Sequence, residues 1–71
     1  MKVEILHDTD GGYGYPKNTI IDAEQLVDDY INCLNKVEDA DTIFYLLSLR
    51  TEYAVDFVAE MWQLDYELLT S

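Results

Sequence analysis

The chain has 71 residues, of which 49% are hydrophobic, and it carries 15 acidic against 4 basic side chains for a net charge of -11. The hydrophobic content excludes a chain that is disordered by composition. The charge excludes attraction to nucleic acid or to anionic membranes and favours basic partners. We therefore expect one globular domain, residues 1–71, near the lower size limit for a stable core.

The single cysteine, Cys33, excludes an internal disulfide framework. No signal peptide or membrane-spanning stretch is recognisable, and so we expect a cytoplasmic protein that does not enter a membrane. Cys33 falls among the apolar positions of its expected helix, which predicts a buried, unreactive thiol.

Residues 2–7 alternate weakly in polarity, which is typical of a short strand. Residues 8–18 include all three glycines and the one proline of the chain, and this composition favours a turn or a long loop. Tyr13 and Tyr15 are large for loop residues. We expect them either to form a second strand or to hold the loop against the helices.

The run Asp8–Gly12 begins like the loop of an EF-hand, in which alternating acids bind calcium. However, Tyr13 and Thr19 occupy the positions at which that motif has Gly and Glu. The sequence therefore predicts a structural turn and no metal site.

Three helices are expected in the rest of the chain. The first begins near Asp22, because Asp22 and Gln25 have capping-box spacing, and it presents one apolar half to the core. The second, roughly residues 42–49, is nearly all apolar and is expected to be buried between its neighbours. The third, residues 51–69, is long and central. The predicted fold is α+β and mostly α: an N-terminal strand or hairpin, a glycine-rich loop and three helices.

The third helix also predicts a row of negative charge. At about 100° per residue, Glu52, Asp56, Glu60 and Glu67 fall within an arc of roughly 80°, with no cation between them. Like-charge pairs four residues apart cost about 0.2 to 0.5 kcal/mol each in an isolated helix, so stability alone does not explain the row. Carboxylates that recur about every 6 Å imitate the phosphates of a nucleic-acid strand. Further acids are expected to flank the row: Asp28, Asp29, Glu38, Asp39 and Asp41.

The apolar arc of the third helix is wider than one packing contact requires. Its second edge is predicted to be the interface of a homodimer, formed by Val55, Trp62, Tyr66 and Leu69. The alternative is that the first helix and the N-terminal strand cover both edges, which leaves a monomer.

No catalytic motif is present. The chain has one His and one Cys, neither spaced as part of a reactive constellation, and 71 residues of mostly helical structure rarely form the cleft that paired-carboxylate chemistry needs. We expect no enzyme activity, no catalytic residues and no cofactor.

In its size, its charge and the acids named above, the chain resembles the small phage-encoded inhibitors that mimic DNA and bind the nucleic-acid sites of host proteins. Among them are host-takeover proteins that block the histone-like HU protein. The resemblance covers the general character of the whole chain. It implies occupation of the DNA-binding groove of a basic protein in the bacterial cytoplasm. The alternative is a small interaction subunit, such as an adaptor or an immunity-type protein, which binds through an aromatic patch around Trp62 and Tyr66.

Overall fold

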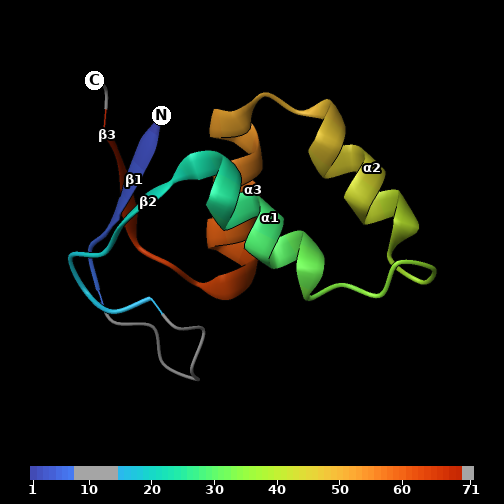
Figure 1. Cartoon of the computed structure of the whole chain (residues 1–71), viewed down its shortest axis with the longest axis horizontal. Helices are drawn as coiled ribbons and strands as arrows, with labels where there is room; N and C mark the ends of the chain where they lie inside the picture. The colour runs from blue at the N-terminus through green and yellow to red at the C-terminus, as the bar shows by residue number, and fades with distance from the viewer. Residues whose placement is uncertain (8–14, 70–71) are drawn as a thin grey trace.

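The computed structural model describes residues 1–7 and 15–69, which form three helices and a three-stranded antiparallel sheet (Figure 1). The sheet forms one layer, α1 and α3 lie beside it, and α2 projects on the side away from the sheet (Figure 1). The predicted α+β class with mostly helical structure is confirmed. In chain order the elements are β1 (Lys2–Ile5), β2 (Ile20–Asp22), α1 (Ala23–Asn32), α2 (Ala40–Ser48), α3 (Thr51–Trp62) and β3 (Tyr66–Leu69).

The N-terminal strand β1 is the centre of the sheet, whose strand order is β2-β1-β3. Val3 and Ile5 are fully buried, whereas Lys2 is exposed and Glu4 is half-buried. Because successive side chains of a strand point to opposite faces, Val3 and Ile5 define the face that packs on the helices. Val3 pairs there with Ile21 of β2 and Leu68 of β3.

A hairpin is formed by β1 and β2, but its second strand is Ile20–Asp22 and not the segment around Tyr15 for which a second strand was considered. Tyr15 is buried against the helices and lies in no strand, so it does not form the second strand that was one of the two possibilities for it. Tyr13 and the run Asp8–Gly12 lie outside the described residues.

The first helix begins where expected, with Asp22 at its N-cap. The Asp22 carboxylate makes no capping hydrogen bond and instead binds Lys2, and so the predicted capping box is absent. Cys33 follows the helix and is exposed, which corrects the prediction of a buried thiol, because α1 ends before the apolar face reaches that position. The buried face of α1 has the three- and four-residue spacing of an amphipathic helix: Ala23, Leu26, Val27, Tyr30 and Ile31.

The prediction of one helix over residues 51–69 was wrong. Helix α3 ends at Trp62, and Gln63 adopts a left-handed conformation with φ 57°. The Leu64 N–H donates to the carbonyl of Ala59 at 2.8 Å, which closes a Schellman motif in which buried Leu64 packs over Ala59. The chain then reverses, and β3 pairs with the edge of β1 that β2 leaves open.

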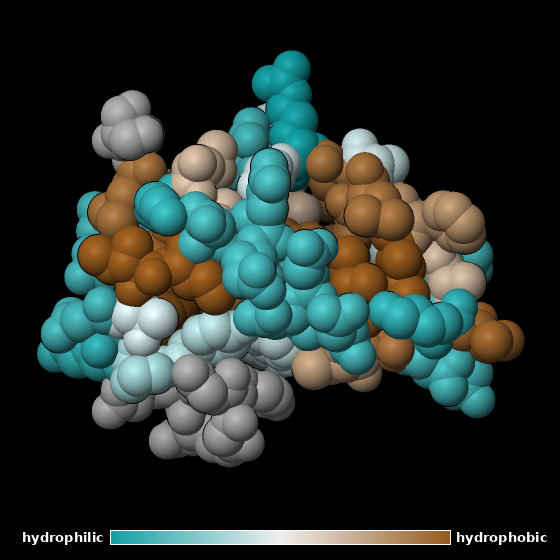
Figure 2. All heavy atoms as spheres, in the orientation of Figure 1, coloured by the Kyte–Doolittle hydropathy of each residue, from teal (hydrophilic) through white to brown (hydrophobic). Residues whose placement is uncertain are grey.

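Helix α2 is not buried between its neighbours, which corrects the second prediction for the helices. Leu46 is buried, but Phe44 is 72% exposed and Leu47 is 65% exposed. The cause is that α1 and α3 pack directly on each other, helped by small residues such as Ala54. Helix α2 therefore lies outside this pair, and Figure 2 shows apolar surface on the side of the molecule where it projects.

In the part of the chain that the structure describes, no helix combines the length and the apolar character that crossing a bilayer requires.

Candidate functional site

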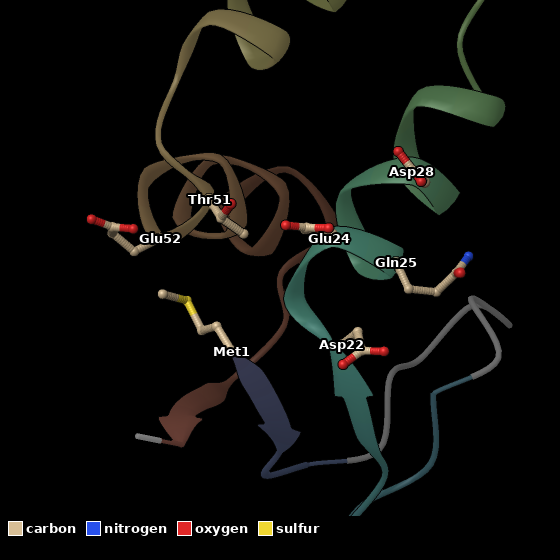
Figure 3. A pocket seen from close by; sticks show the side chains of 7 residues that line it. All are labelled: Met1, Asp22, Glu24, Gln25, Asp28, Thr51 and Glu52. Atoms are coloured by element: carbon tan, nitrogen blue, oxygen red, sulfur yellow. The ribbon is translucent and has the colours of Figure 1, made fainter. Parts of the chain in front are cut away.

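An open hollow lies where the beginnings of α1 and α3 meet the sheet (Figure 3). Its volume is about 580 Å³, and carboxylates surround it: Asp22 at the end of β2, Glu24 and Asp28 on α1, and Glu52 on α3. Met1, Gln25 and Thr51 complete the lining. We call this site the acidic hollow.

The acidic hollow is placed by elements that the core fixes. Glu24 and Asp28 are one helical turn apart on α1, beside its buried face, and Glu52 is in the first turn of α3. Because α1 and α3 pack side by side, their acids line one open hollow, and Figure 3 shows the Glu52 carboxylate directed away from Glu24 and Asp28. The hollow therefore gathers charge from separate parts of the sequence.

Little positive charge from side chains balances this site. The Lys2 ammonium lies 2.7 Å from Asp22, and this hydrogen bond together with the Lys2 charge lowers the pKa of Asp22 from its ordinary value of 3.8. Within residues 1–7 and 15–69, no Lys or Arg side chain is at ion-pair distance from Glu24, Asp28 or Glu52. Three carboxylates of the hollow are thus left for a partner.

The arrangement does not favour a metal ion. Among the described residues, no three His, Cys, Asp or Glu side chains lie close enough together to hold one. Carboxylates that are spread around an open hollow suit a broad cationic surface better than a single ion.

The predicted acidic row is shorter than expected. Glu52, Asp56 and Glu60 lie on α3, but Glu67 lies on β3, where it pairs directly with Glu4 of β1. The end of α3 at Trp62 is the reason for this correction. Glu67 therefore belongs to the outer face of the sheet and not to the helical row.

Some of the flanking acids have roles inside the fold. Asp29 accepts hydrogen bonds from the Tyr15 hydroxyl at 2.5 Å and from the Gln25 amide at 2.8 Å. Asp39 accepts one from the backbone N–H of Asn35 at 3.0 Å, which ties the turn before α2. Both acids therefore help to hold the chain together.

Of the remaining flanking acids, Asp28 lines the acidic hollow, whereas Glu38 and Asp41 are exposed at the other end of α2 from Thr51. A helix of nine residues separates them from the start of α3 by about 13 Å. The predicted acids thus form separate groups instead of one continuous surface.

The four residues predicted as a dimer edge do not form one edge. Val55 is fully buried in the core of the same chain, and Trp62 is half-buried there. Tyr66 and Leu69 are on β3, where the Tyr66 hydroxyl donates to Asp56 at 3.2 Å. The prediction assumed that α3 continued to Leu69, and the turn at Gln63 removes that geometry.

Aromatic rings connect the loop to all three helices. Tyr15 contacts Trp62 with ring centroids 5.9 Å apart, and Trp62 contacts Tyr30 at 5.2 Å. Tyr30 contacts Phe57 at 6.2 Å, and Phe57 contacts Tyr45 of α2 at 5.7 Å. We call this series the aromatic ladder; its tilted and edge-on contacts stabilise the core, in which Trp62 is half-buried.

Burial is the main cause of raised pKa values for three tyrosines. The pKa of Tyr15 is raised by burial and then by its hydrogen bond to Asp29. The pKa of Tyr30 is raised by burial and by the charge of Asp39, and that of Tyr66 by burial and Asp56. These phenols hold their protons more tightly in the fold than in an open chain.

Sequence reasoning missed Asp22 and Glu24 as members of the site. A signal was available for Glu24, which forms a like-charge pair with Asp28 four residues later, as the acids of the α3 row do with one another. No comparable signal marks Asp22, whose position depends on how β2 leads into α1.

No known protein family, curated protein or solved structure matches the chain.

Proposed function

We propose that the chain binds a basic nucleic-acid-binding protein as a mimic of nucleic acid and inhibits it by occupying its DNA site. The observation that carries the proposal is the acidic hollow, which Glu24, Asp28 and Glu52 line without a lysine or arginine partner among the described residues. Unpaired carboxylates repel one another and weaken the fold slightly. A partner that neutralises them removes this repulsion, which favours binding.

The dimensions of the chain support this proposal. Its longest extent is 33 Å, which is close to one helical turn of duplex DNA, about 34 Å. Over that length a duplex carries about 20 phosphate charges, on the same scale as the 15 acids of the chain. A monomer therefore matches about one turn in length, while its acids lie in separate groups on the surface.

The test compares two variants with the same change in charge. The hollow variant carries Glu24→Gln, Asp28→Asn and Glu52→Gln. The remote variant carries Glu38→Gln, Asp41→Asn and Glu67→Gln, which removes the same three charges from other surfaces. Each tagged protein is used to capture partners from a bacterial lysate, and the bound proteins are released with increasing salt.

We expect the unmodified chain to capture basic DNA-binding proteins and to release them as salt rises, because screening weakens contacts between exposed charges. The hollow variant should bind at least tenfold more weakly, and the remote variant less than threefold. Partners that are neutral or acidic, complexes that resist salt, or equal losses in the two variants would contradict the proposal.

A further inference from the structure

Helix α2 exposes apolar side chains that the fold of one chain does not cover. Phe44, Tyr45 and Leu47 are each more than half exposed. Asp41 is the only charged residue of the helix. Exposed apolar side chains that gather on one element indicate a contact surface, since each would be more stable away from water.

A second hollow lies along this helix, between α2, α1 and the start of α3. Its apolar lining includes Val27, Leu46, Leu47 and Ala54, and its volume is about 250 Å³. A cavity of about 150 Å³ holds a benzene ring, so this space has room for at least one large apolar side chain. We call it the apolar groove.

The apolar groove continues into the acidic hollow. Glu24, Asp28 and Thr51 line both of them, so the two form one surface with an apolar end and an acidic end. A ligand that fits this surface must present apolar groups beside positive charge.

We propose that this combined surface binds an amphipathic, cationic helix of the partner. The inference rests on the proposed function and names the kind of segment recognised. Apolar side chains of the partner helix enter the groove against Leu46 and Leu47. Its Lys and Arg side chains lie against Glu24, Asp28 and Glu52. Helices with one apolar and one basic face bind acidic proteins through apolar grooves of this kind.

A second copy of the chain fits this surface poorly. Each copy has a net charge of -11 and only four Lys and Arg residues, of which Lys2 is held by Asp22. Two copies in contact at this surface would bring the Glu24, Asp28 and Glu52 carboxylates of both chains together beside an apolar centre. Charge complementarity therefore selects a basic occupant.

Two synthetic peptides of identical Lys and Leu composition, each about 18 residues long, serve as probes. One places Leu at every third and fourth position, so that it forms an amphipathic helix, and the other distributes Leu around the helix. Calorimetry gives the dissociation constant of each peptide for four proteins: the unmodified chain, the hollow variant, Leu47→Gln, and Val37→Gln as a matched control. Val37 is exposed outside the groove, so both substitutions change the surface and not the core.

We expect the amphipathic peptide to bind at least tenfold more tightly than the scrambled one. Leu47→Gln should remove most of that difference, and Val37→Gln should keep it. Equal binding of the two peptides, or no effect of Leu47→Gln, would overturn the inference. If both peptides bind the hollow variant more weakly than the unmodified chain, the acidic hollow still binds cations and the proposed function survives. If neither peptide binds the hollow variant more weakly, both the proposed function and the helix-binding inference fail. Sedimentation as a dimer that Leu47→Gln dissociates would also overturn the inference, because a second copy would then occupy the groove.

Discussion

At the scale of single residues, Tyr15 shows how the fold uses its acids for two purposes. Its ring contacts Trp62, and its hydroxyl donates to Asp29, so one side chain ties the segment before β2 to both α1 and α3. Asp28, the neighbour of Asp29, points into the acidic hollow. Adjacent acids of one helix therefore serve stability and a candidate site.

The first prediction concerns Tyr15→Phe, which keeps the ring and removes the hydroxyl. We expect the free energy of unfolding to fall by about 1.5 kcal/mol near neutral pH, because a hydrogen bond to a charged acceptor is lost. The midpoint of urea unfolding measures this change. Tyr45→Phe is the control, since the ring of Tyr45 contacts Phe57 but its side chain is half exposed, and it should shift the midpoint little. Equal shifts in the two variants would contradict the importance of the Asp29 bond.

The second prediction concerns alkaline pH. The pKa values of Tyr15, Tyr30 and Tyr66 are raised above the ordinary value of 10.0. A raised folded-state pKa means that the stability is fully present below the unfolded pKa, about 10, and is lost as pH rises through the folded pKa. The free energy of unfolding should therefore decline above about pH 10, and the decline should be smaller in Tyr15→Phe. Parallel pH profiles for the two proteins would show that Tyr15 does not contribute.

At the scale of elements, the end of α3 decides which acids lie together. The apolar pattern continues through Leu64, Leu68 and Leu69, so the sequence favours one long helix. The structure uses the same residues differently, because Leu64 closes a Schellman motif and Leu68 pairs with Val3 in the sheet. Periodicity alone cannot distinguish a longer helix from a turn and a strand, because the strand depends on hydrogen bonds to β1, which lies at the other end of the chain.

Gln63→Gly tests this turn directly. A non-glycine residue in the left-handed region is strained, and glycine is not, so the substitution should raise the free energy of unfolding by about 0.5 kcal/mol. Gln63→Ala is the control and should change it little, because alanine carries the same strain. If Gln63→Gly instead lowers the stability by about 1 kcal/mol, as glycine does inside a helix, α3 continues past Trp62 and the turn is wrong.

Helix α2 shows the opposite error of sequence reasoning. Its apolar composition predicted burial, yet Phe44 and Leu47 are exposed because α1 and α3 pack on each other and leave no space between them. The strand β1 and the start of α1 were predictable, since short-range polarity patterns and turn residues determine them, whereas the position of β2 at Ile20–Asp22 was not predicted. The exposure of α2 depends on how the helices pack on one another. A local sequence pattern carries no information about that packing.

At the scale of the whole molecule, net charge was the most informative property of the sequence. It predicts a basic partner, which stays a prediction, but not which acids line one hollow, because Glu24 and Glu52 border the same opening only after α1 and α3 pack together. The same charge opposes the fold through self-repulsion, so the free energy of unfolding should rise with added salt even as partner binding weakens. Urea unfolding of the free chain at several salt concentrations measures the first of these effects. A stability that falls with salt would contradict the view that repulsion between the acids outweighs their attraction to the few basic groups of the chain.

The most direct measurement of the proposed function is displacement of DNA. A fluorescent duplex is bound to the basic protein that the chain captures, and its anisotropy is followed as the unmodified chain, the hollow variant or the remote variant is added. If the chain occupies the DNA site, anisotropy falls to the value of free duplex with the unmodified chain and the remote variant, and stays high with the hollow variant. If anisotropy stays high or increases with the unmodified chain, the protein binds elsewhere or not at all, and mimicry of nucleic acid is wrong.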